Sequence, residues 1–151
     1  MAVYNLQVLR GLETNRSILS CRPDGLVDLW IEDDGSGRQQ WELIRRPDLG
    51  NHVFNIKVVG GTEEGKTFLS CTRDGSKVDL FNIDDGSGRQ QWVFAPVTIN
   101  PQIPAYYTLS PLRGAGGLLS CTADGTKVDL FEGDDFTGRQ RWQLQGEPSA
   151  V

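Results

Sequence analysis

Residues 37–41 read GRQQW, and the same five positions return as GRQQW at 88–92 and as GRQRW at 138–142. Three other motifs recur in register with this one. They are LSC at 19–21, 69–71 and 119–121; VDL followed by an aromatic residue at 27–30, 78–81 and 128–131; and DD at 33–34, 84–85 and 134–135. Such periodicity indicates one structural unit in three copies. We call these copies repeat 1 (1–48), repeat 2 (49–99) and repeat 3 (100–151).

Each repeat reads as four short strands. Apolar residues alternate with polar ones, as with Leu6 and Val8 around Gln7, and no segment keeps a helical period of 3.6. Turns rich in Asp and Gly separate the strands. A small β unit cannot cover its own apolar face, so three copies must close on each other, which also removes exposed sheet edges. We therefore predict an all-β chain of twelve strands, forming a single β-trefoil domain over residues 1–151.

Composition narrows the functional classes. The net charge of −5 and the lack of a basic stripe argue against nucleic-acid binding, which draws most of its affinity from phosphate contacts. No apolar run approaches the roughly 20 residues of a membrane span, and the first residues do not resemble a secretory signal. Three cysteines cannot all pair within the chain, and we expect them to be reduced. These features predict a cytoplasmic protein without membrane insertion, with unconventional secretion as the alternative.

Strand alternation assigns the faces of the third strand in each repeat. Val27 and Leu29 are predicted to point inward, which leaves Asp28 and Trp30 outward. The same pattern makes three outward pairs of an aspartate and an aromatic residue: Asp28 with Trp30, Asp79 with Phe81, and Asp129 with Phe131. On the second strand, Ser20 is predicted outward and Cys21 inward. Gln39 is expected to bind backbone amides of its own repeat, with Trp41 in the core.

The three Gln-x-Trp triplets, at 39–41, 90–92 and 140–142, resemble the threefold Q-x-W signature of ricin-B-type β-trefoil lectins. The resemblance covers essentially the whole chain and extends to fungal β-trefoil lectins. It implies a sugar site in each repeat, built from the aromatic residue, the polar residue two positions before it and the residue before Q-x-W. On this chain those positions are Asp28, Trp30 and Arg38; Asp79, Phe81 and Arg89; and Asp129, Phe131 and Arg139.

Two positions depart from the family pattern in every repeat. An aspartate that grips sugar hydroxyls in the family is replaced by Ser20, Ser70 and Ser120, and an asparagine is replaced by the three arginines. Any bound sugar must then take its acceptor from Asp28, Asp79 or Asp129. A purely structural interpretation also stands, in which Asp28 pairs with Arg38 across adjacent strands, with equivalent pairs in the other repeats. Exposed pairs of that kind contribute about 0–1 kcal/mol.

The leading hypothesis is a non-enzymatic protein that binds glycans or glycoproteins at up to three shallow sites. The alternative is a protein-interaction subunit or loop-based protease inhibitor, acting through loops 60–66 and 100–105, which differ between the repeats. No catalytic set accompanies the lone His52. The Asp33–Gly37 loop lacks the later bidentate Glu of a calcium loop and is interpreted as a turn. We therefore expect no enzyme activity, no cofactor and no metal.

Overall fold

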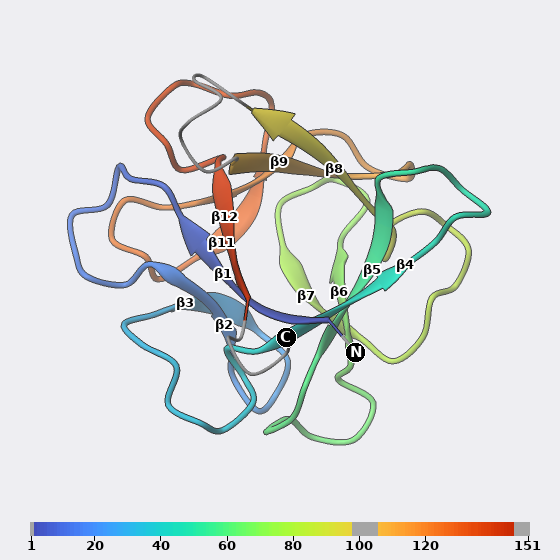
Figure 1. The fold of residues 1–151 in the computed structure, drawn as a ribbon, viewed down its shortest axis with the longest axis horizontal. Helices are drawn as coiled ribbons and strands as arrows, with labels where there is room; N and C mark the ends of the chain where they lie inside the picture. The colour runs from blue at the N-terminus through green and yellow to red at the C-terminus, as the bar shows by residue number, and fades with distance from the viewer. Residues whose placement is uncertain (1, 98–105, 147–151) are drawn as a thin grey trace.

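The computed structural model describes residues 2–97 and 106–146. Within these ranges the chain forms strands and no helix, so none of the described segments is a helix that could cross a membrane. Figure 1 shows the strands arranged around a common centre, which confirms the predicted all-β, β-trefoil fold. The strands are β1 (Val3–Val8), β2 (Ile18–Cys21), β3 (Val27–Trp30), β4 (Trp41–Arg45), β5 (Val53–Val58), β6 (Phe68–Cys71), β7 (Val78–Phe81), β8 (Trp92–Val97), β9 (Tyr106–Pro111), β10 (Leu118–Cys121), β11 (Val128–Phe131) and β12 (Trp142–Gly146).

The first and fourth strands of the repeats form a closed barrel. β1 pairs with β4, β4 with β5, β5 with β8, β8 with β9, β9 with β12, and β12 returns to β1, all antiparallel. Closure leaves no free edge among these six strands. The second and third strands of each repeat form hairpins, β2–β3, β6–β7 and β10–β11, and β2 and β6 also pair briefly with the barrel strands β1 and β5.

The three hairpins meet each other at one end of the barrel. The amide of Leu29 donates to the carbonyl oxygen of Gly125 at 3.2 Å, Leu80 to Gly25 at 3.0 Å, and Leu130 to Gly75 at 3.1 Å. Each turn glycine thus joins its hairpin to the next one around the threefold axis. All three have φ between 73° and 92°, a region where side chains with a Cβ are strained.

The Gln-x-Trp motifs lie where β4, β8 and β12 begin. Trp41, Trp92 and Trp142 are fully buried, and each indole Nε1 donates a 2.9 Å bond to a leucine carbonyl oxygen of the second strand in its own repeat. The three cysteines are buried and unpaired, as predicted for small apolar residues. Burial raises the pKa of the Cys21 thiol to about 12, which keeps it protonated.

Replacing Trp92 with alanine tests how much the fold depends on this anchor. The change removes a fully buried side chain and its hydrogen bond, so we expect the free energy of unfolding to fall by about 3–5 kcal/mol. Ile83→Ala is the matched control, because Ile83 is 53% exposed and its truncation should change stability by less than about 0.5 kcal/mol. Urea denaturation measures both. Equal effects of the two substitutions would contradict this account.

Candidate functional site

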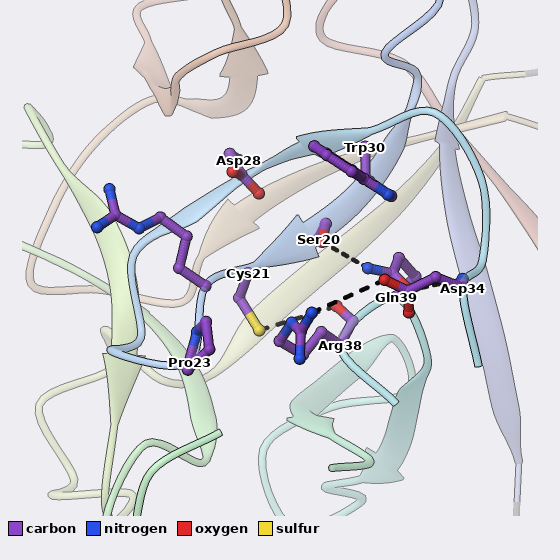
Figure 2. Close-up of a pocket in the computed structure, with 9 residues that line it drawn as sticks. Ser20, Cys21, Pro23, Asp28, Trp30, Asp34, Arg38 and Gln39 are labelled. Atoms are coloured by element: carbon purple, nitrogen blue, oxygen red, sulfur yellow. Dashed lines mark hydrogen bonds and ion pairs between the residues drawn. The ribbon is translucent and has the colours of Figure 1, made fainter. Parts of the chain in front are cut away.

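A shallow hollow lies against the β2–β3 hairpin and the loop that leads into β4. It has a volume of about 210 Å³ and is lined by nine residues, eight of which are labelled in Figure 2. Asp28 and Trp30 come from β3, Ser20 and Cys21 from β2, and Arg38 and Gln39 from the segment before β4. We call it hollow 1. Figure 2 shows Asp28 and Trp30 on one side of it and Arg38 on the other.

The other two repeats form the same hollow. Hollow 2, of about 290 Å³, is lined by Ser70, Cys71, Thr72, Arg73, Asp79, Phe81, Arg89 and Gln90. Hollow 3, of about 360 Å³, is lined by Ser120, Cys121, Thr122, Ala123, Asp129, Phe131, Asp135, Arg139 and Gln140. The structure therefore brings together all nine residues that the sequence predicts for the three sites, one set in each hollow.

The aromatic residues at the ends of β3, β7 and β11 are exposed, as alternation predicts. Trp30 is 37% exposed, Phe81 41% and Phe131 42%. In repeat 1, the guanidinium carbon of Arg16 lies 5.0 Å from the centroid of the Trp30 ring, and the same guanidinium donates to the carbonyl oxygen of Leu29. Arg16 does not line hollow 1, so this cation–π contact fixes the indole and leaves its surface at the hollow open.

The aspartates of β3, β7 and β11 are half-buried. Among the described residues, no side chain donates a hydrogen bond to the carboxylates of Asp28, Asp79 and Asp129 or forms an ion pair with them within 4.0 Å, and only Asp79 receives a hydrogen bond from a backbone amide, its own. Burial raises the pKa of all three, against the opposing pull of nearby cations such as Arg16 at Asp28 and Lys127 at Asp129. Each hollow therefore holds a partly desolvated acceptor that has no side-chain partner among the described residues.

The predicted pairing of Asp28 with Arg38 is wrong. Arg38 instead pairs with Asp34, with a 3.7 Å separation, and its equivalents do the same at 3.7 Å for Arg89 and Asp85 and 3.9 Å for Arg139 and Asp135. The reason is topological, because β3 pairs with β2 while the segment after Arg38 enters the barrel as β4. Each arginine is thus held at its hollow by the loop before it.

Ser20 lies on the predicted face but is buried instead of exposed. It stands opposite Asp28 in the β2–β3 register, yet only 3% of its surface is accessible. The Gln39 side chain covers it, donating a 2.9 Å bond from Nε2 to the Ser20 hydroxyl while its Oε1 accepts from the Asp34 amide at 3.0 Å. This confirms the expected bond from Gln39 to a backbone amide. The bond to Ser20 was missed, although serine and glutamine recur together in every repeat.

The carboxylates of the acidic turn before each Gln-x-Trp motif have partners within the turn and on neighbouring strands. Asp33 accepts hydrogen bonds from the Asn5 and Gln40 side chains and from the Gly35 amide. Asp34 accepts from the Ser36 amide and pairs with Arg38. These bonds match the interpretation of the loop as a turn stabilised by its own aspartates. In the described ranges no three His, Cys, Asp or Glu residues cluster as metal ligands would.

The structure describes only one of the two loops proposed for protein recognition. Loop 60–66 is tied to repeat 1, because the Glu63 amide donates to the Pro23 carbonyl oxygen at 2.8 Å and Lys66 packs over Gly25. Loop 100–105 lies outside the described residues. A protein-interaction or protease-inhibitor role for these loops stays a prediction.

A scan against protein families finds no match for this sequence, and a search of curated proteins finds none either. Solved structures match across nearly the whole chain. The designed threefold-symmetric protein ThreeFoil aligns with a TM-score of 0.67 and 25% identity, over 95% of this chain and 97% of its own. The BEL β-trefoil aligns with a TM-score of 0.70 and 14% identity, over 97% and 93%. An exo-β-1,3-galactanase from Clostridium thermocellum aligns with a TM-score of 0.68 and 22% identity, over 97% of this chain and 30% of the enzyme. These similarities place the chain among β-trefoil proteins.

Removing the charge of Asp129 should stabilise the protein at neutral pH. Burial raises the pKa of Asp129 in the folded protein, so folding disfavours the ionised carboxylate. The protonated carboxyl is tolerated at low pH, and the free energy of unfolding decreases as the pH rises through the folded-state pKa. We expect Asp129→Asn to unfold at higher urea concentration than the unchanged protein at pH 7. This advantage should shrink when both are acidified below the pKa of an unfolded aspartate, about 3.9.

Asp124→Asn in the same hairpin is the matched control, and its effect should have the opposite sign. The Asp124 carboxylate accepts hydrogen bonds from Thr122 and Thr126, which lower its pKa to about 2. Its contribution is present above the unfolded pKa and is lost as pH falls towards 2. Destabilisation by Asp129→Asn at pH 7 would show instead that this carboxylate has a structural partner.

Proposed function

We propose that this protein is a carbohydrate-binding β-trefoil, with up to three shallow sites and no catalytic activity of its own. The observation that carries this proposal is the unsatisfied, half-buried aspartate beside an exposed aromatic ring in all three hollows. A structural role alone gives no reason to keep a desolvated carboxylate without a partner in every repeat, because such a group opposes folding at neutral pH.

The two groups suit the two kinds of surface on a sugar ring. An aromatic face covers the apolar C–H patch of a pyranose, and a carboxylate accepts strong, directional hydrogen bonds from adjacent hydroxyls. Trp30 offers the largest stacking surface of the three and is already held by Arg16. The hydroxyls would supply the hydrogen bonds that Asp28 lacks in the free protein, so binding would offset the cost of its burial.

The geometry also indicates how affinity would arise. The hollows are open and small, at about 210 to 360 Å³, which is at or below the lower end of the range for ligand pockets, so each would bind a single sugar weakly. The threefold axis presents the three hollows at fixed separations on one rigid scaffold. A branched or repetitive glycan that reaches two of them would gain affinity through a high effective concentration.

A glycan array followed by titration of the best ligand tests the proposal. Trp30→Ala should weaken binding at hollow 1 by about two- to tenfold, the loss expected for one aromatic stacking contact. Phe136→Ala is the control, because Phe136 is 74% exposed and lines none of the three hollows. Absence of any glycan hit, with no binding of simple sugars at millimolar concentration, would contradict the proposal.

Binding should also depend on pH in the acidic range. Asp28, Asp79 and Asp129 must be ionised to act as full acceptors, and burial raises their pKa above that of an ordinary aspartate. Affinity should therefore begin to fall at a higher pH than an unperturbed aspartate would dictate, while the protein remains folded. Calorimetric titration from pH 7 downward, with circular dichroism at each pH, measures this. A flat profile down to about pH 4 would show that the carboxylates do not contact the ligand.

A further inference from the structure

The three hollows differ in the rim residue two positions after the buried cysteine. Hollow 2 has Arg73 there, whereas hollow 1 has Pro23 and hollow 3 has Ala123. All three side chains line their hollow. The difference adds a second arginine to hollow 2, beside Arg89, and leaves hollow 3 with Arg139 alone.

Arg73 has no acidic partner within 4.0 Å among the described residues and is exposed. Hollow 1 also has a second arginine, Arg22, but that residue is neutralised by Asp24 at 3.2 Å. The counterpart of Asp24 in repeat 2 is Asp74, whose carboxylate accepts hydrogen bonds from Thr72 and Ser76 instead. The charge of Arg73 is therefore available at the rim of hollow 2.

Cations also border hollow 2 on its other side. Asp79 lines hollow 2 and, together with Asp24, Lys66 and Lys77, a neighbouring polar hollow of about 230 Å³ between repeats 1 and 2. Both lysines act on the Asp79 carboxylate, opposing the effect of burial on its pKa. In repeat 3 the position of Lys66 is Gly116, so Asp129 retains Lys127 alone.

The net charge of the linings differs accordingly. Hollow 3 has Asp129 and Asp135 against one arginine, Arg139. Hollow 2 has Asp79 against Arg73 and Arg89, with the two lysines just beyond. Among the lining residues alone, hollow 1 is balanced, with Arg22 and Arg38 against Asp28 and Asp34. Of the three hollows, hollow 2 is therefore the one whose lining has an excess of cations, and because Arg89 pairs with Asp85 at 3.7 Å, the arginine left without an acidic partner there is Arg73.

We propose that hollow 2 selects an anionic sugar, one that bears a carboxylate or a sulfate, and that Arg73 determines this specificity. The inference rests on the proposed function. The sugar ring would lie on Phe81 with hydroxyls toward Asp79, and its acidic group would lie at the rim by Arg73. A guanidinium binds a carboxylate or sulfate through two parallel hydrogen bonds, which a neutral sugar cannot form.

Matched pairs of sugars test this by NMR. ¹⁵N-labelled protein is titrated with methyl glucuronide against methyl glucoside, and with galactose 6-sulfate against galactose. Amides of 70–73 and 78–81 report hollow 2, and those of 120–123 and 128–131 report hollow 3. We expect at least one acidic sugar to bind hollow 2 about two- to fivefold more tightly than its neutral partner, as one exposed ion pair allows, with a preference that weakens in salt. The pair of sugars that shows this preference identifies whether hollow 2 selects a carboxylate or a sulfate.

Two substitutions and one control locate the preference. Arg73→Ala should abolish it at hollow 2, and Ala123→Arg should create it at hollow 3. Arg45→Ala removes the same charge from an exposed site on β4 that lines none of the hollows, and should leave the preference in place. Because Arg73 and Ala123 are not buried, neither change threatens the fold.

The outcomes separate this inference from the proposed function. Neutral and acidic sugars that bind hollow 2 equally would overturn the inference and leave the carbohydrate-binding proposal standing. A preference that survives Arg73→Ala would overturn the role of this residue. No shift in any hollow with any of the four sugars, together with an empty glycan array, would overturn both.

Discussion

The hydrogen bonds of the Gln-x-Trp motif are the constraint on which the rest of the structure depends. In repeat 1 the Trp41 indole binds the Leu19 carbonyl oxygen, and the Gln39 amide joins the Ser20 hydroxyl to the Asp34 backbone. These three contacts fasten a hairpin strand and an acidic turn to the start of a barrel strand, and all three recur in the other repeats. Because buried polar groups are costly when unpaired, the set specifies one arrangement of the hairpin against the barrel.

The same contacts form the floor of each hollow and leave its aspartate free. In each hollow the serine hydroxyl accepts a hydrogen bond from the glutamine of Gln-x-Trp, and the arginine forms an ion pair with the second aspartate of the turn. Neither side chain therefore pairs with Asp28, Asp79 or Asp129. Each of these aspartates is kept half-buried by a scaffold that gives it no partner. Groups that oppose folding and lie in a concave surface beside an exposed aromatic ring are typical of binding sites, where stability is exchanged for function.

Much of the fold and most of the site could be predicted from the sequence because the same motifs occupy equivalent positions in all three repeats. Alternation alone placed Asp28 and Trp30 on the outer face, whereas Arg38 was assigned to the same site through the resemblance to Q-x-W lectins. What alternation could not give was the partner of each polar group. The predicted Asp28–Arg38 pair does not form because the segment after Arg38 enters the barrel as β4, whereas Asp28 lies in the β2–β3 hairpin. The burial of Ser20 was not predicted because it depends on Gln39, nineteen residues away in the sequence. The distinct charge of hollow 2 depends on which charged side chains of repeat 2 line the hollow and which already have partners, and this required the structure.

A crystal structure of the protein bound to its best glycan measures the central claim directly. The account predicts a sugar ring stacked on Trp30, Phe81 or Phe131, with a hydroxyl oxygen within about 2.6–3.2 Å of the aspartate two residues earlier in the chain. It also predicts that the Gln39–Ser20 bond and its equivalents are unchanged, since the hollow is already formed in the free protein. A glycan held elsewhere on the surface, with all three aspartates still without a ligand contact, would contradict it.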